Sequence, residues 1–388
     1  MSVTAPRGFR ASGVPAGLKA SGAPDVALVV NDGPAAAVAG VFTANRVKAA
    51  PVLWSQQVVR GGQVRAVVLN SGGANACTGA PGFQDTHATA EHLAAALTAV
   101  GPELGAGEVA VCSTGLIGER LPMDRLLPGV DAAVAALALD GGAAAARAIM
   151  TTDTRPKTTE VNAEGWTVGG IAKGAGMLAP ALATMLCVLT TDAVAEPDAL
   201  DEALRAACRV SFDRLDSDGC LSTNDTVLLL ASGASGIAPG RAELTAAVTT
   251  ACRDLARQLL SDAEGATKEI AIEVVGAADE DDAVEVGRAV ARNNLVKTAL
   301  FGNDPNWGRI LAAVGTTRAA FDPDALDVAI NGVWVCRAGG AAEDRAKVDL
   351  TGRDVDIRID LHAGPATATI WTNDLSHAYV HENSAYSS

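Results

Sequence analysis

Aromatic residues and basic residues are scarce in this sequence. It contains six Phe, five Trp and two Tyr among 388 residues, and 30 Lys and Arg against 45 Asp and Glu, which gives a formal net charge of −15. Proteins that bind nucleic acid without sequence preference neutralise its phosphates with Lys and Arg. The composition therefore argues against nucleic acid as a partner.

Long apolar stretches are also missing. The longest apolar run, residues 177–189, is interrupted by Pro180 and Thr184 and is shorter than the ~18 to 20 residues that cross a bilayer. Residues 1–7 lack the apolar stretch of a signal peptide. We expect a protein without a membrane span that works in the cytoplasm.

The spacings of metal sites are missing as well. The seven cysteines form no C-x-x-C pair, and the five histidines form no H-x-x-x-H or H-E-x-x-H pattern. Such spacings are typical of zinc sites, and an odd, scattered set of cysteines is not typical of a disulfide framework. We expect neither a metal site nor disulfides.

Small apolar residues and short β-type runs are abundant. Helical periods separate several of the runs, which predicts an α/β or α+β fold. The clearest helix covers about residues 241–261, and a second begins at Asp198 after Pro197. No repeat or linker divides the chain, so we expect two closely packed halves. The β-type runs are residues 26–30, 67–69, 109–112, 166–171, 185–189, 227–230, 270–275, 326–330, 355–361 and 366–371.

Glycine-rich turns suggest two kinds of site. Residues 174–179 match G-x-G-x-x-A, but Pro180 and the apolar run after Thr184 predict a break and a strand where a dinucleotide site needs a helix. Residues 113–118 follow a strand and leave backbone N–H groups uncovered, as in an oxyanion hole, although most such turns are only turns. Residues 70–76 have the same ambiguity.

No nucleophile stands out from spacing alone. Thr184 has the properties of a buried strand threonine. Lys173 and Glu264 have those of solvated surface charges. The residue pattern by itself leaves these alternatives open.

Several segments together resemble the ornithine acetyltransferase family. The segment K-G-A-G-M-L-A-P-A-L-A-T-M-L, residues 173–186, is similar to that family's self-cleavage segment. The resemblance extends in family order to the C-terminal H-E-N-S-A-Y-S-S. The other similar segments are residues 40–51, 222–226, 295–299 and 304–309.

The resemblance implies a self-cleaving protein with an N-terminal threonine. Cleavage between Ala183 and Thr184 would give an α fragment, residues 1–183, and a β fragment, residues 184–388, built from layered sheets with flanking helices. Thr184 would then carry a free α-amine, with an unperturbed pKa of ~8, beside its hydroxyl nucleophile. Such a pair explains a catalytic site without His or Cys.

The resemblance also implies the other site residues. Thr114 and Gly115 match the family's oxyanion pair, one through its hydroxyl and the other through its backbone N–H. The positions that match substrate contacts are Thr152 (chosen over Thr151), Lys173, Thr184, Glu264, Asn383 and Ser388.

The implied reaction is acetyl transfer from N2-acetyl-L-ornithine to L-glutamate, in arginine biosynthesis, through an acetyl ester of Thr184. Some family members also use acetyl-CoA as donor. The resemblance further implies no metal or organic cofactor, and fragments that stay together as a heterotetramer or larger assembly. Two alternatives remain: an N-terminal-threonine amidohydrolase or aminopeptidase, and a catalytically silent homologue that serves binding or assembly.

Overall fold

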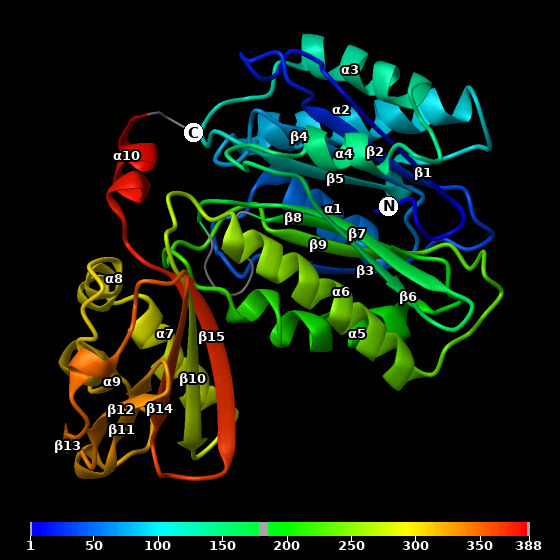
Figure 1. The fold of residues 1–388 in the computed structure, drawn as a ribbon. Helices are drawn as coiled ribbons and strands as arrows, with labels where there is room; N and C mark the ends of the chain where they lie inside the picture. Colours follow the sequence, from blue (N-terminus) through cyan, green and yellow to red (C-terminus); the bar gives the residue numbers. More distant parts are fainter. Residues whose placement is uncertain (1, 178–184, 386–388) are drawn as a thin grey trace.

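Two sheets stacked face to face, with helices on both outer sides, form the body of the molecule (Figure 1). The structure is a computed structural model that describes residues 2–177 and 185–385. The first sheet has the order β1-β2-β4-β5, with strands Phe9–Val14, Val26–Asn31, Ala66–Ser71 and Val109–Thr114. The second has the order β3-β9-β8-β7-β6, with strands Ala37–Phe42, Thr226–Ala231, Leu186–Thr191, Thr167–Lys173 and Lys157–Asn162.

Both faces of the central strands are buried, and this explains their continuous apolar runs. In β8, Leu186 and Val188 face the core between the two sheets, whereas Cys187 and Leu189 face the helices beyond the second sheet. Successive side chains of a strand point to opposite faces, so each position needs an apolar residue. All ten β-type runs predicted from the sequence lie within strands, wholly or in all but one terminal residue.

The helices of the body cover the two outer faces and fill the space between the sheets. Helices α2 and α3 pack on the first sheet, α5 and α6 pack on the second, and α1 and α4 contribute to the central core. Helix α5 begins at Pro197, one residue before the predicted start at Asp198, and α6 buries the predicted residues Leu244, Val248, Cys252, Leu255 and Leu259. In chain order the six helices are Ala50–Arg60, Gly79–Thr98, Met123–Ala135, Gly142–Ala148, Pro197–Arg209 and Arg241–Ser261.

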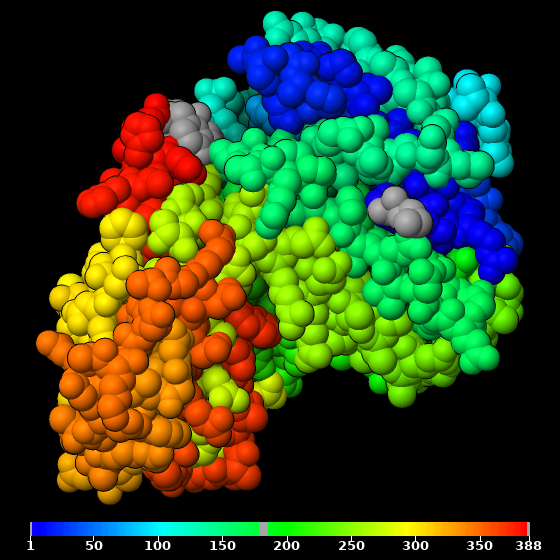
Figure 2. All heavy atoms as spheres, viewed as in Figure 1, coloured from blue at the N-terminus to red at the C-terminus, as the bar shows by residue number. Residues whose placement is uncertain are grey.

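A smaller lobe with its own core projects from the body, and the surface is hollowed between the two (Figure 2). Its sheet has the order β13-β12-β11-β14-β10-β15, with strands Gly340–Ala341, Val333–Arg337, Asp327–Ile330, Asp354–Asp360, Glu269–Ala277 and Ala366–Asn373. Helices α7 to α9 are Glu280–Ala291, Asn294–Phe301 and Trp307–Val314, and α10 is His377–Ala385. Short 3-10 helices are Ala106–Glu108, Phe212–Arg214 (η2), Pro323–Ala325 and Arg345–Lys347.

The layered α/β architecture confirms the predicted fold class. The division between body and lobe falls after α6, so it does not follow the predicted fragment boundary at Ala183 and Thr184, which lie outside the described residues. None of the described helices is long and apolar enough to cross a membrane.

Candidate active site

Most of the predicted site residues line one pocket at the ends of β5, β7 and β9. It brings together Thr114, Gly115, Lys173, Glu264 and Asn383, and both Thr151 and Thr152 line it. Ala183, Thr184 and Ser388 lie outside the described residues. The remaining lining residues are Ala74, Ile117, Gly176, Met177, Ser222, Thr223 and Asn224.

The parallel strands β4 and β5 position the predicted oxyanion pair. Thr114 ends β5, and its carbonyl accepts hydrogen bonds from the N–H groups of Gly72, at 2.9 Å, and Gly73, at 3.1 Å. Gly115 has φ +130°, and a Cβ there would lie 2.6 Å from the Gly73 nitrogen. Only glycine fits this close approach of two backbone turns.

Lys173 is buried against Thr114. It ends β7, is 2% exposed, and donates from Nζ to Thr114 Oγ1 at 3.3 Å. Burial lowers the pKa of the Lys173 ammonium, and the negative charge of Asp153 opposes this shift. Because the Thr114 oxygen accepts from Lys173, the hydroxyl hydrogen of Thr114 can point to another acceptor.

A buried ion-pair network supports Lys173 from behind. Asp153 Oδ1 accepts from Gly174 N–H at 2.7 Å and lies 2.5 Å from Lys157 Nζ, which also lies 2.6 Å from Asp262 Oδ2. Burial raises the pKa of Asp153, but the charges of Lys173 and Lys157 outweigh it and hold that pKa below its ordinary value. The network fixes the start of the 174–177 turn.

The loop that carries Thr151 and Thr152 is hydrogen-bonded to the same network. Thr151 donates its backbone N–H to Asp153 Oδ2 at 3.0 Å. Thr151 is exposed and Thr152 is half-buried, while both line the pocket. The greater burial of Thr152 is in keeping with its selection over Thr151 as a substrate contact. The contact itself stays a prediction.

Glu264 brings an acidic group to the opposite wall. It is 8% exposed, its N–H donates to the Ala175 carbonyl at 3.0 Å, and its Oε2 accepts from Asn383 Nδ2 at 3.0 Å. A Cβ on Gly176 would lie 2.6 Å from Glu264 Oε2, so glycine makes room for the carboxylate. The α10 helix supplies Asn383 from the far end of the chain.

Sequence reasoning missed the structural role of Asn224. Its Nδ2 donates to the Ala74 carbonyl at 2.7 Å and to the Ser113 carbonyl at 2.8 Å, which ties β9 to the loops beside Thr114. The signal was available, because residues 222–226 were among the segments of the family resemblance, but the segment alone does not reveal which backbone groups the amide reaches.

The neighbouring Asp225 is a second residue that the sequence did not single out. It is fully buried, and its Oδ1 accepts from the N–H of Met185, the residue bonded to Thr184, at 3.0 Å. Its Oδ2 is buried with no partner in the part of the chain that the structure describes. Burial raises the pKa of Asp225 well above its ordinary value, which favours the neutral acid next to this segment.

Within residues 2–177 and 185–385, no group of three or more His, Cys, Asp or Glu side chains is arranged to hold a metal ion. The site offers instead a buried ammonium, a carboxylate, a hydroxyl and amide groups. This set suits recognition of a small zwitterion and stabilisation of a developing oxyanion.

Comparison with known proteins decides the family. Residues 10–388 match the ArgJ family model. The chain belongs to the ArgJ family. The arginine biosynthesis bifunctional protein ArgJ of Streptomyces avermitilis is 69% identical over 388 residues, which cover 100% of both chains. That of Thermobifida fusca is 67% identical over 387 residues, again with 100% of both chains covered.

Two solved chains match parts of this one. The ornithine acetyltransferase of Mycobacterium tuberculosis is 67% identical, with 46% of this chain and 94% of that chain covered and a TM-score of 0.46. The ArgJ protein of Bacillus halodurans is 35% identical, with coverages of 51% and 97% and a TM-score of 0.48. The family match confirms the predicted class, an acyltransferase of arginine biosynthesis.

Proposed function

We propose that the protein moves acetyl from N2-acetyl-L-ornithine to L-glutamate through an acetyl ester on Thr184. The observation that supports this most is the placement of Lys173 and Glu264, with opposite charges, in the same pocket as Thr114 and Gly115. Donor and acceptor are both amino acids with a carboxylate and an amine or amide to bind. One pocket with one charge of each sign can accept them in turn.

The nucleophile arises by self-cleavage, in which one water molecule hydrolyses the peptide bond between Ala183 and Thr184 and gives residues 1–183, with a new carboxylate, and residues 184–388, with a new α-amine. The freed α-amine takes the Thr184 hydroxyl proton while the oxygen attacks the acetyl carbonyl. The ornithine amine then leaves with that proton. The amine of glutamate attacks the ester carbonyl and loses a proton to the α-amine of Thr184, which passes it to the Thr184 oxygen as the ester bond breaks.

Thr114 and Gly115 stabilise the oxyanion of both tetrahedral intermediates. The Thr114 hydroxyl is oriented by the hydrogen bond that its oxygen accepts from Lys173, so its hydrogen is available to the developing charge. The N–H of Gly115 is the second donor. We assign the substrate carboxylate to Lys173 and the substrate amine to Glu264 and Asn383, with Thr152 and Ser388 as further contacts.

We further propose that acetyl-CoA serves as an alternative donor at the same threonine, that the fragments form a heterotetramer or larger assembly, and that the enzyme works in the cytoplasm without a metal or organic cofactor. The acidic surface, with its net charge of −15, then favours solubility. The sequence resemblance is the basis of the statements on donor, assembly and cofactor, and the lack of a membrane span and signal peptide is the basis of the location.

Labelled acetylornithine tests the reaction. Purified protein incubated with acetylornithine labelled in its acetyl group should give labelled acetylglutamate when glutamate is present. Without glutamate, label should stay on the 184–388 fragment, because the ester has no amine acceptor. Label recovered mainly as acetate in both incubations would contradict the transferase and favour the amidohydrolase.

Substitutions at Thr184 test the nucleophile. Thr184→Ala removes the hydroxyl and should abolish both cleavage and acetyl transfer, whereas Thr184→Ser keeps a hydroxyl and should retain measurable amounts of both. Mass spectrometry of the denatured protein reports the fragments. An uncut chain that still transfers acetyl, or transfer by Thr184→Ala, would show that the nucleophile lies elsewhere.

A further inference from the structure

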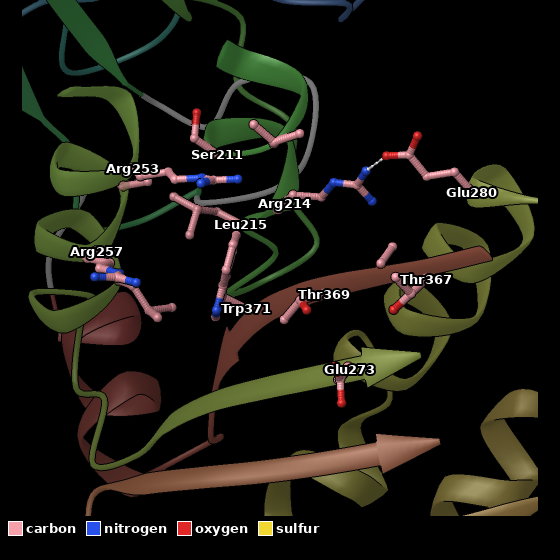
Figure 3. A pocket seen from close by; sticks show the side chains of 14 residues that line it. Ser211, Arg214, Leu215, Arg253, Arg257, Glu273, Glu280, Thr367, Thr369 and Trp371 are labelled. Atoms are coloured by element: carbon pink, nitrogen blue, oxygen red, sulfur yellow. Dashed lines mark hydrogen bonds and ion pairs between the residues drawn. The ribbon is translucent and has the colours of Figure 1, made fainter. Parts of the chain in front are cut away.

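A second cleft lies between the body and the small lobe, apart from the candidate active site. Figure 3 shows α6 on one side, η2 and the segment after it above, and strands β10 and β15 below. It shares no lining residue with the candidate active site. The lining residues are Val210, Ser211, Arg214, Leu215, Arg253, Ala256, Arg257, Leu260, Glu273, Glu280, Thr367, Ala368, Thr369 and Trp371.

Two arginines with no acidic partner point into this cleft. Arg253 and Arg257 are four positions apart on α6, so their side chains leave the same face of the helix, and both are exposed (Figure 3). Neither forms an ion pair or side-chain hydrogen bond with any other described residue. The two guanidinium groups therefore place free positive charge at this cleft, on a protein whose net charge is −15.

The acidic side chains of the cleft do not neutralise these arginines, because both are paired elsewhere. Glu273 pairs with Arg358 at 3.1 Å. Glu280 pairs with Arg209 at 2.6 Å and also with Arg214. The arginines of α6 therefore keep their free positive charge, and Glu280, one carboxylate shared by two guanidinium groups, leaves a further positive charge beside Arg214.

Arg214 adds an unsatisfied donor to the wall. It is 6% exposed, donates from Nε to the Arg209 carbonyl at 2.9 Å, and pairs with Glu280 through Nη2. Its Nη1 is buried and has no partner among the residues described. A buried N–H group without an acceptor is costly, so this wall of the cleft carries an uncompensated polar group.

The opposite wall combines hydroxyls with an aromatic ring. Thr367, Thr369 and Trp371 occupy alternate positions of β15, so they share one face of the strand, and all three line the cleft. Thr367 already donates its hydroxyl to the Val274 carbonyl at 3.0 Å. The half-buried indole of Trp371 offers an apolar surface.

We propose that this cleft is a second binding site, for a small organic anion whose carboxylate or phosphate pairs with Arg253 and Arg257 and whose apolar part lies against Trp371. Planar guanidinium groups bind both kinds of oxyanion through paired N–H donors. Pockets with an apolar wall and few placed polar groups are typical of small-molecule sites. The two arginines set the charge of the ligand, and the tryptophan sets its shape.

Calorimetric titration of the purified assembly tests the charge requirement. The probes are phenyl phosphate and 3-phenylpropionate, one for each oxyanion, at constant ionic strength. At least one should bind saturably, and the double variant Arg253→Gln, Arg257→Gln should weaken that binding about tenfold or more, because two charge-assisted contacts are lost. The two probes distinguish a phosphate from a carboxylate ligand.

A charge-matched double variant is the control. Arg60→Gln, Arg147→Gln also removes two exposed helix arginines, neither of which lines the cleft, and should leave the affinity within about twofold of the unmodified protein, since only screened long-range attraction changes. Equal weakening in both double variants, or no saturable binding of either probe, would overturn the proposal. Circular dichroism and the thermal midpoint establish that each variant is folded.

Inorganic phosphate tests the role of the indole. It has no apolar part, so Trp371→Leu should weaken phenyl phosphate or 3-phenylpropionate several-fold more than it weakens inorganic phosphate. The same loss for all probes, or no loss for any, would contradict an apolar contact at Trp371.

Discussion

At the residue scale, burial changes what individual side chains do. Lysine is normally a solvated surface residue, yet Lys173 is buried, and its ammonium donates a hydrogen bond to Thr114 Oγ1. The negative charge of Asp153, 20 positions earlier, opposes the effect of that burial on the pKa of Lys173. Without such a counter-charge a buried ammonium would be neutralised or excluded. A counter-charge such as that of Asp153 therefore makes a buried lysine possible at this position.

Thr114 gives the residue-scale prediction. Thr114→Val keeps the shape of the side chain but removes the hydroxyl, and should lower kcat for acetyl transfer by ~10² to 10³, as expected for loss of one oxyanion donor. Thr114→Ser keeps the donor and should stay within about tenfold of the unmodified enzyme. The measurement uses protein whose fragments begin at Thr184, so that slower self-cleavage is not counted. A Val variant as fast as the Ser variant would exclude Thr114 from the oxyanion hole.

At the element scale, α10 depends on a glycine turn for its contact with the pocket. Gly265 has φ +62°, and a Cβ there would lie 2.2 Å from the backbone nitrogen of Tyr379 in α10. Ser376 Oγ donates to the Gly265 carbonyl at 2.5 Å and accepts from Tyr379 N–H at 3.0 Å. The turn therefore presses directly against the helix that presents Asn383.

Gly265→Ala should displace α10 and with it Asn383. We expect KM for acetylornithine to rise roughly tenfold, because a hydrogen bond to the Glu264 carboxylate is lost. Gly236→Ala is the matched control: Gly236 also has positive φ, +73°, but no atom lies within 4 Å of its Cβ position. Both substitutions strain the backbone, but only Gly265→Ala creates a steric clash. Steady-state kinetics of the two variants therefore separate the effect of the clash from the effect of the strain. An equal KM in both would mean that α10 contributes no binding.

The elements differed in how well their sequences predicted them. The four- and three-residue spacing of α6 predicted its bounds, because its buried stripe repeats over about four turns. Strand β6, with the sequence K-T-T-E-V-N, was not predicted. Among the described strands it lies at the edge of its sheet and pairs with β7 alone, so it lacks the apolar run of a strand buried on both faces.

At the scale of the whole molecule, the two predicted fragments interleave in one sheet. Strands β8 and β9 belong to residues 184–388, and they lie between β7 and β3, which belong to residues 1–183. The core under this sheet also includes residues from both sides of the predicted cleavage site. Separating the fragments would break the β3–β9 and β7–β8 pairings, and would expose four strand edges and this core.

We therefore expect cleaved protein to behave as one body. The fragments should co-elute in size-exclusion chromatography under native conditions, at the volume of the uncut Thr184→Ala variant, and separate only at denaturant concentrations that unfold the sheet. Circular dichroism along the same denaturant series reports the unfolding. Separation of the fragments in native buffer would contradict the interleaved sheet.

The sequence by itself determined the strand runs, the α6 stripe and the segments that identify the family, because these depend on local periodicity and on residue types at fixed spacing. Only the tertiary structure decided which polar groups are buried together. Lys173 and Glu264 are 91 positions apart, and Asn383 is a further 119 beyond, yet all three line one pocket. Their meeting depends on how sheets and helices far apart in the chain pack, and no local pattern encodes that packing.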